Sequence, residues 1–175
     1  MLVLIQFPTK SKIRTIVYLS LLISIGVVLN LIEPVQIFPL LPGAKLGLAN
    51  VSTVLAILLF NGIYGILVAI IRTIVSQVFR GTFNWISFGT SFFGGVSASI
   101  VMSVAHYLFR KKMSIEGISA LGGIINNVSQ VIFVYLVTKN SFFIYYLFFL
   151  IPIGGVVGFV VGILSHTVYN RLKLQ

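Results

Sequence analysis

The chain of 175 residues is 58% apolar and 8% charged, and its mean hydropathy is +1.13. A soluble domain carries about a quarter charged residues, so this composition excludes a soluble globule and indicates an integral membrane protein. Twelve Lys and Arg accompany only two acids. Because the basic residues cluster at the ends of apolar stretches, they indicate membrane topology and not nucleic-acid binding. The absence of cysteine excludes disulfides and thiolate chemistry.

The two acids are Glu33 and Glu116. Magnesium-dependent diphosphate chemistry and paired-carboxylate hydrolysis each need several carboxylates in one site. The sequence therefore predicts a protein that is not an enzyme, with no catalytic residues, no metal site and no cofactor.

Six apolar stretches are predicted to form the transmembrane helices of an all-α protein, because each crossing needs roughly 20 apolar residues. In chain order they cover residues 13–32, 48–60, 63–79, 86–109, 118–137 and 142–169. The second is short and is expected to form a hairpin with the third, turned at Asn61-Gly62. Residues 114–117, which include Glu116, are predicted to connect the fourth and fifth helices.

The chain is expected to form a single transmembrane domain over residues 1–175. Within it, residues 1–12 are predicted to be a cytoplasmic or interfacial segment, residues 13–169 a six-helix bundle, and residues 170–175 a cytoplasmic tail.

The distribution of Lys and Arg predicts that both termini are cytoplasmic, because cytoplasmic connections carry the excess of basic residues. Basic residues gather in the terminal flanks and after the fourth helix. The opposite side has Lys45, Arg80 and Lys139. The proline-stiffened connection between the first two helices then faces outside, and a loop of this length usually has a function.

The third helix is predicted to carry two arginines on one face, since Arg72, Ser76 and Arg80 are spaced at i, i+4 and i+8. Counted from Gly62, Arg72 lies roughly 15 Å along the helix, close to the bilayer midplane. A buried guanidinium needs a counter-charge, and only Glu33 is at the appropriate end. A ligand carboxylate or phosphate could supply it. The alternatives are that Arg72 binds helix carbonyls or trapped water, and that Arg80 simply marks the interface.

The fifth helix carries three amides, Asn126, Asn127 and Gln130, in an apolar stretch. Such amides must face inward, where they either bond a neighbouring helix or line a polar cavity. Helix counting puts them level with Arg72, which favours a cavity. The other substrate-binding candidates on the same side are Lys45, Asn50 and Asn84.

Small residues recur every four positions on the fourth and sixth helices. They are Ser91, Gly95, Ser99 and Ser103, and then Gly154, Gly158 and Gly162. Such stripes usually pack helices within one protein. The shorter pair Ser20 and Ser24 on the first helix could instead dock a partner helix.

His106 and His166 are predicted to lie at similar depths near the cytoplasmic ends of their helices. A haem bridging them is conceivable. Histidines near an interface are more often ordinary hydrogen-bonding residues, and no cofactor is predicted.

Three motifs resemble the Gx transporter family, whose members are often labelled heptaprenyl diphosphate synthase component I. They are the segment KLGLANV that starts at Lys45, Arg72-Thr73 with Arg80-Gly81, and Gly122-Gly123 with Asn126-Asn127. The resemblance extends from roughly Ile13 onward. With its long outer connection and short second helix, the chain also resembles the S components of energy-coupling factor (ECF) transporters.

The resemblance implies an S-component-like bundle in a prokaryotic cytoplasmic membrane. It implies a substrate-binding component that takes up a small anionic, vitamin-like or prenyl-related metabolite, with a site in the outer half of the bundle. The resemblance also implies a transmembrane scaffold and two ATPase subunits as partners. The chain lacks a G-x-x-x-x-G-K motif, so the energy for transport must come from elsewhere. S components present Ala-x-x-x-Ala to the scaffold, and here Ser20 and Ser24 match it most nearly.

The alternative is a non-catalytic membrane subunit associated with polyprenyl diphosphate, quinone or flavin-linked electron-transfer metabolism. In that case Arg72 and Arg80 would bind an anionic cofactor or lipid. Prenyl transfer uses aspartate-rich magnesium motifs, and the chain has no aspartate. Catalysis would therefore belong to another subunit.

Overall fold

The computed structural model describes residues 12–33, 45–81, 84–109 and 112–173. Within them the chain forms six α-helices and one short 3₁₀-helix. They are α1 (Lys12–Ile32), α2 (Asn50–Leu59), α3 (Gly62–Phe79), α4 (Trp85–Phe109), α5 (Ile115–Thr138), η1 (Ser141–Tyr146) and α6 (Leu147–Lys173). The predicted all-α fold class is confirmed.

Five of the described helical segments are long and apolar enough to cross a membrane: α1, α3, α4, α5 and the continuous η1–α6 segment. The exception is α2, which has 10 residues. A helix of that length rises about 15 Å, or roughly half of a bilayer core. The stretch predicted as a second span is therefore too short to cross alone, because residues 45–49 are not helical and α2 begins only at Asn50.

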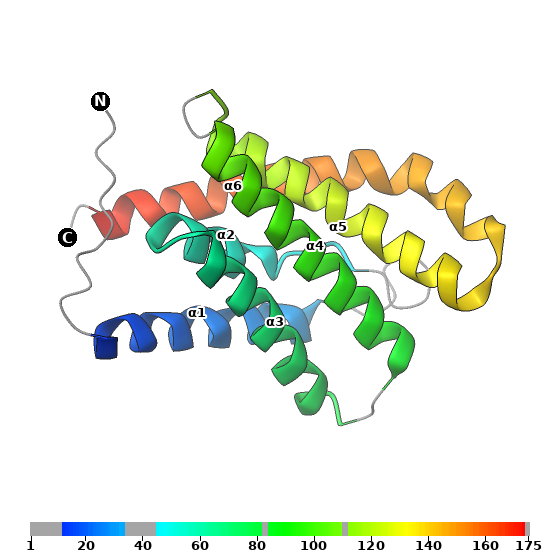
Figure 1. Cartoon of the computed structure of the whole chain (residues 1–175), viewed down its shortest axis with the longest axis horizontal. Helices are drawn as coiled ribbons and strands as arrows, with labels where there is room; N and C mark the ends of the chain where they lie inside the picture. The colour runs from blue at the N-terminus through cyan, green and yellow to red at the C-terminus, as the bar shows by residue number, and fades with distance from the viewer. Residues whose placement is uncertain (1–11, 34–44, 82–83, 110–111, 174–175) are drawn as a thin grey trace.

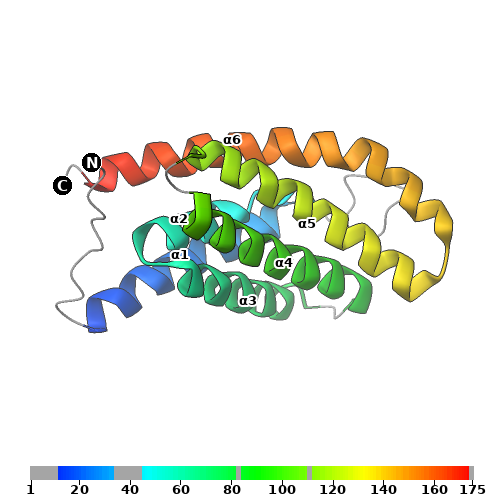
Figure 2. The ribbon, with the colours of Figure 1, turned by 45° about the horizontal axis from the view of Figure 1, so that its top comes forward.

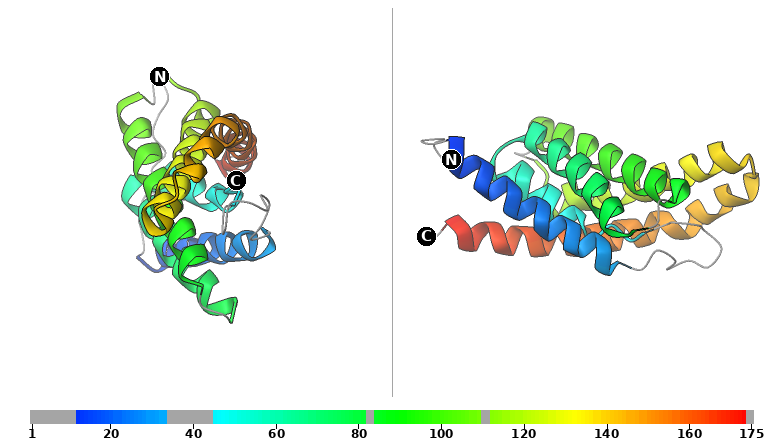
Figure 3. Two further views of the ribbon diagram at one scale, coloured as in Figure 1. Left: turned by 90° about the vertical axis from the view of Figure 1, so that its right-hand side faces the viewer. Right: turned by 90° about the horizontal axis from the view of Figure 1, so that it is seen from below.

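The helices form an elongated bundle in which the start of α1 and the end of α6 lie at the same end (Figure 1). We call the opposite end of the bundle the far end. Helix α6 runs along α5 (Figure 2) and extends over most of the length of the bundle (Figure 3, right). The short α2 packs against α1, α3, α4 and α6 and therefore lies near the centre. Which end of the bundle is cytoplasmic stays a prediction.

Apolar side chains fill the space around α2. One cluster packs Val54 and Ile57 of α2 against Met102 of α4 and Val161 of α6. Because lipid tails are as apolar as these side chains, the helices associate through close van der Waals packing and not through a hydrophobic driving force.

Glycines bring α5 and α6 into direct backbone contact. A Cβ atom on Gly154 would lie 2.6 Å from the carbonyl oxygen of Gly123, and one on Gly158 would lie 2.5 Å from that of Ser119. A Cβ on Gly162 would lie 2.5 Å from the Cα of Glu116. The prediction that the small-residue stripe of the last helix packs helices together is therefore confirmed.

Helix α5 begins earlier than predicted, so Glu116 lies in its first turn and not in a connection. Ser114 caps the helix, since its side-chain oxygen accepts a hydrogen bond from the Gly117 amide at 3.2 Å. An acid in the first turn is favoured by the helix dipole, which explains why this polar segment is helical. The Glu116 carboxylate also contacts His166 of α6, with Oε1 2.6 Å from Nδ1.

The last helix differs from the prediction at both ends. Residues 141–146 form the 3₁₀-helix η1. Asn140 precedes it and caps it, because its side chain accepts a hydrogen bond from the Phe142 amide at 2.9 Å. At the other end α6 continues to Lys173, so most of the predicted tail is helical.

Candidate functional site

A small polar pocket lies between residues of α1, α2, α3, α4 and α5, where the end of α1 meets the segment that precedes α2. It has room for about one water molecule. The residues that line it are Asn30, Glu33, Lys45, Gly47, Ala49, Asn50, Arg72, Ser91, Asn126 and Gln130. Five of the eight predicted substrate-binding residues are therefore brought together: Lys45, Asn50, Arg72, Asn126 and Gln130.

Side chains from distant helices hold the non-helical segment that precedes α2. Gln130 of α5 accepts a hydrogen bond from the Lys45 amide at 2.9 Å and donates one to the Lys45 carbonyl at 3.2 Å. Glu33, at the end of α1, accepts one from the Gly47 amide at 2.5 Å. Non-helical backbone inside a membrane protein needs such partners. Gln130 and Glu33 therefore fix the backbone that forms one wall of the pocket.

Three cations gather at this pocket, and each donates to a neutral oxygen. Arg72, which is 4% exposed, donates from Nη2 to Asn50 Oδ1 at 2.8 Å. Lys45 donates from Nζ to Asn30 Oδ1 at 2.7 Å. The half-buried Arg80 donates to the Asn30 carbonyl, and its Nη2 lies 3.5 Å from Asn30 Oδ1.

Negative charge is scarce around these cations. None of them forms an ion pair within the described part of the chain, and Glu33 is the only acid that interacts with them electrostatically. Burial, and then the charge of Arg80, lower the pKa of Lys45 to about 7. Burial likewise raises the pKa of Glu33 above its ordinary range. The pocket is thus electropositive and poorly compensated.

Two polar atoms of pocket-lining residues have no hydrogen-bond partner among the described residues: Arg72 Nε and Ser91 Oγ. Gly95 of α4 leaves space beside the guanidinium, because a Cβ there would lie 3.2 Å from Arg72 Nη2. A buried donor without a partner is costly, and in native proteins it usually marks a place that water, an ion or a ligand occupies.

The amides of α5 divide between the pocket and the helix interface. Asn126 lines the pocket, and its Nδ2 lies 3.4 Å from Asn127 Oδ1. Asn127 donates to the Leu150 carbonyl of α6 at 2.8 Å. The sequence left two roles open for these amides, and both occur. Asn126 lines the cavity, and Asn127 bonds a neighbouring helix.

Five of the predicted residues do not line the pocket: Arg80 and Asn127, described above, and Asn84, Ser20 and Ser24. Asn84 is exposed and caps α4, accepting hydrogen bonds from Ile86 and Ser87 amides. Ser20 and Ser24 are exposed on α1, where Ser24 Oγ donates to the Ser20 carbonyl at 2.9 Å.

The sequence reasoning missed Asn30, which binds both Lys45 and Arg80. An isolated amide three residues before Glu33, in an otherwise apolar helix, was the available signal. It also missed Ser91 as a pocket residue, because a small polar residue in a repeating stripe indicates packing first.

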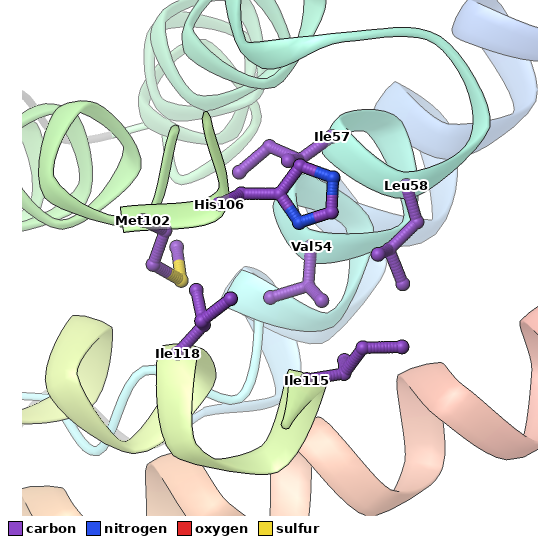
Figure 4. A pocket seen from close by; sticks show the side chains of 7 residues that line it. All are labelled: Val54, Ile57, Leu58, Met102, His106, Ile115 and Ile118. Atoms are coloured by element: carbon purple, nitrogen blue, oxygen red, sulfur yellow. The ribbon is translucent and has the colours of Figure 1, made fainter. Parts of the chain in front are cut away.

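A second, apolar pocket lies between α2, α4 and α5, and His106 projects into it (Figure 4). It is lined by Val54, Ile57, Leu58, Met102, His106, Ile115 and Ile118, and also has room for about one water molecule. His166 contacts Glu116 instead. The described residues contain no cluster of three or more metal-ligating side chains.

Comparisons with known proteins agree with this architecture. A solved structure of the S component of a bacterial ECF transporter is similar, with a TM-score of 0.62 and 23% sequence identity, over 93% of this chain and 97% of that chain. The likeness supports the fold of a multi-pass membrane bundle. No curated protein sequence matches the chain.

The sequence model of one protein family matches residues 22–168, which is most of the chain. This match agrees with the family resemblance predicted from the sequence motifs. The protein therefore belongs to the family described as heptaprenyl diphosphate synthase component I.

Proposed function

We propose that this protein is the substrate-binding membrane component of an ECF-type transporter, and that it takes up a small anionic metabolite. The similarity of the whole bundle to an S component supports the transporter role. The composition of the polar pocket supports an anionic substrate.

One observation carries the proposal. Arg72 is 4% exposed, its Nε has no partner among the described residues, its Nη2 donates to the neutral oxygen of Asn50, and it forms no ion pair with Glu33 of the same pocket. A guanidinium placed purely for structure would be expected to complete its hydrogen bonds with carbonyls or a carboxylate. An anion in the pocket would supply both the missing acceptor and the missing charge.

Binding requires the pocket to enlarge, because it has room for about one water molecule. An anionic group could replace Asn50 on Arg72 and Asn30 on Lys45, since charge-assisted hydrogen bonds are about twice as strong as neutral ones.

The transporter role also requires partners. We propose that a transmembrane scaffold docks against the exposed face of α1 and that two ATPase subunits supply the energy. Ser20 and Ser24 suit close helix packing, because they are small and the Ser24 hydroxyl is already satisfied within α1.

The test is native mass spectrometry of the full chain purified from its own membranes, as wild type and as Arg72→Gln. Wild type is expected to retain an acidic small molecule and to co-purify with scaffold and ATPase subunits. Arg72→Gln is expected to lose the molecule, with affinity lower by at least about thirtyfold, and to keep its partners. With the bound molecule removed from both proteins, thermal unfolding should show equal or higher stability for the variant, because an uncompensated buried charge is removed.

Lys112→Gln is the matched control, because Lys112 is exposed between α4 and α5. Retention of the small molecule by Arg72→Gln would contradict the anion site. Co-purification with a soluble prenyl- or flavin-metabolising enzyme and no ATPase would replace the transporter with the alternative of a non-catalytic membrane subunit.

A further inference from the structure

Few acidic side chains are available to neutralise the three cations at the polar pocket. The whole chain has two acids, and Glu116 is paired with His166 on α6, with 2.6 Å between the two side chains. Residues 34–44 contain no charged side chain. Glu33 is therefore the only counter-charge within the protein for Lys45, Arg72 and Arg80.

Shared hydrogen-bond partners bring these groups to one place. Lys45 Nζ and Arg80 Nη2 lie 2.7 Å and 3.5 Å from the same atom, Asn30 Oδ1. Arg72 donates to Asn50. Asn30, Asn50 and Arg72 all line the pocket. One head group at this point could reach all three cations.

The carboxylate of Glu33 is buried and already accepts a backbone hydrogen bond. Its Oε1 accepts from the Gly47 amide at 2.5 Å, and Glu33 is 2% exposed. If Glu33 is ionised it offsets one of the three cations, and two positive charges remain in a desolvated site. Like charges that converge on one neutral oxygen repel each other strongly when water is excluded.

On the basis of the proposed function, we propose that the substrate carries two negative charges on one head group, which Lys45, Arg72 and Arg80 bind together. A phosphate monoester and a dicarboxylate both meet this requirement. A single negative charge would leave one buried cation without a counter-charge. With two, the loaded site is neutral overall, and the three cations exchange the oxygens of Asn30 and Asn50 for anionic oxygens.

Matched pairs of ligands test the effect of charge separately from the effects of size and shape. Phenyl phosphate and phenyl sulfate have the same shape but differ by one charge at pH 7, since a phosphate monoester has its second pKa near 6. Succinate and succinamate differ in the same way. Binding of each to the detergent-solubilised full chain is measured from the shift in thermal unfolding, at constant ionic strength because salt screens such contacts.

Each doubly charged probe is expected to bind at least tenfold more tightly than its singly charged partner. Comparison of the two pairs shows whether the site prefers a phosphate monoester or a dicarboxylate. Equal or tighter binding of the singly charged partners in both pairs would overturn the inference.

A variant that lacks one of the three cations provides a second test of the proposal. Lys45→Gln removes one cation, so the preference for the doubly charged probe should fall at least tenfold while binding of phenyl sulfate persists. If Lys45→Gln does not fold, Arg80→Gln makes the same deletion at the half-buried rim. The control Lys112→Gln should keep the full preference, and an unchanged preference in the site variants would contradict the proposal.

Failure of this inference is distinguishable from failure of the proposed function. ATP-driven uptake of a singly charged substrate would overturn the two-charge site and leave the transporter role intact. Binding of doubly charged probes by a protein that never assembles with ATPases would do the reverse.

Discussion

Gly47 has a backbone conformation that few other residues adopt, with φ of 91°. Gly47→Ala is expected to destabilise the protein by about 1–2 kcal/mol. It should also weaken ligand binding, because the new Cβ would lie 3.0 Å from Asn50 Nδ2 and 3.1 Å from Asn126 Nδ2. Thermal unfolding and binding of phenyl phosphate measure the two effects.

Gly81 is the matched control for this change. Its φ is 71°, but a Cβ there would have no neighbour within 4 Å. Gly81→Ala should therefore lower stability by a similar amount and leave binding unchanged. Equal loss of binding in both variants would mean that Gly47 affects stability alone.

Lys45 makes binding of an anion dependent on pH. Its pKa is about 7, compared with an ordinary value of 10.5, because it is buried near Arg80 and Arg72 with Glu33 as the opposing charge. A bound anion favours the protonated amine, so binding above pH 7 takes up a proton. Affinity should then fall by up to about tenfold for each pH unit above 7.

The measurement is the affinity at several pH values for succinate, whose two charges do not change above neutral pH. In Lys45→Gln the decline should flatten, because the group that takes up the proton is absent. If the affinity of the variant declined equally steeply with pH, the proton taken up on binding would belong to another group.

At the scale of elements, the contact between α5 and α6 depends on glycines, which have no side chains. Gly158→Ala places a Cβ 2.5 Å from the Ser119 carbonyl oxygen, and this backbone cannot move away alone. We expect a cost of about 1–3 kcal/mol, as for other overpacked contacts. Gly155→Ala is the control, because its Cβ would lie 3.6 Å from Ile124, an ordinary contact. Unfolding in detergent measures both, and equal stability of the two variants would contradict the close contact.

The long helices could be predicted from the sequence because an apolar stretch of spanning length has few alternatives in a membrane. The start of α5 could not, since Ser114 and Glu116 look like a polar connection until the cap is recognised. The start of α2 was also missed. Leu48 and Ala49 continue the apolar pattern, and the turn before Asn50 depends on Gly47 and on the distant Glu33.

The site was predictable to the extent that charge in a membrane is conspicuous. Arg72 and the amide Asn126 could be identified because each is costly in an apolar helix. Asn30 could not be ranked in the same way, because its importance comes from two cations that reach it from elsewhere in the chain. Asn84 was selected by its position in a connection, whereas its side chain caps α4.

For the whole molecule, the orientation in the membrane is the prediction that can be tested most directly. The chain has no cysteine, so single substitutions provide unique labelling sites. In intact cells an impermeant thiol reagent should label Ser141→Cys, in η1 at the far end. It should label Lys112→Cys, between α4 and α5, only after the cells are permeabilised. The opposite pattern would invert the topology.

Under the proposed function, the uncompensated charge of the pocket would make the movement of a site without a bound anion sensitive to voltage. Moving one charge across the membrane involves about 2.3 kcal/mol for each 100 mV, and the empty site carries two when Lys45 is protonated. An interior-negative potential would hold the empty site toward the cytoplasm. A site loaded with a doubly charged anion would move without electrical work. Under the proposed function, the return of the empty site is then the step that the ATPases must drive.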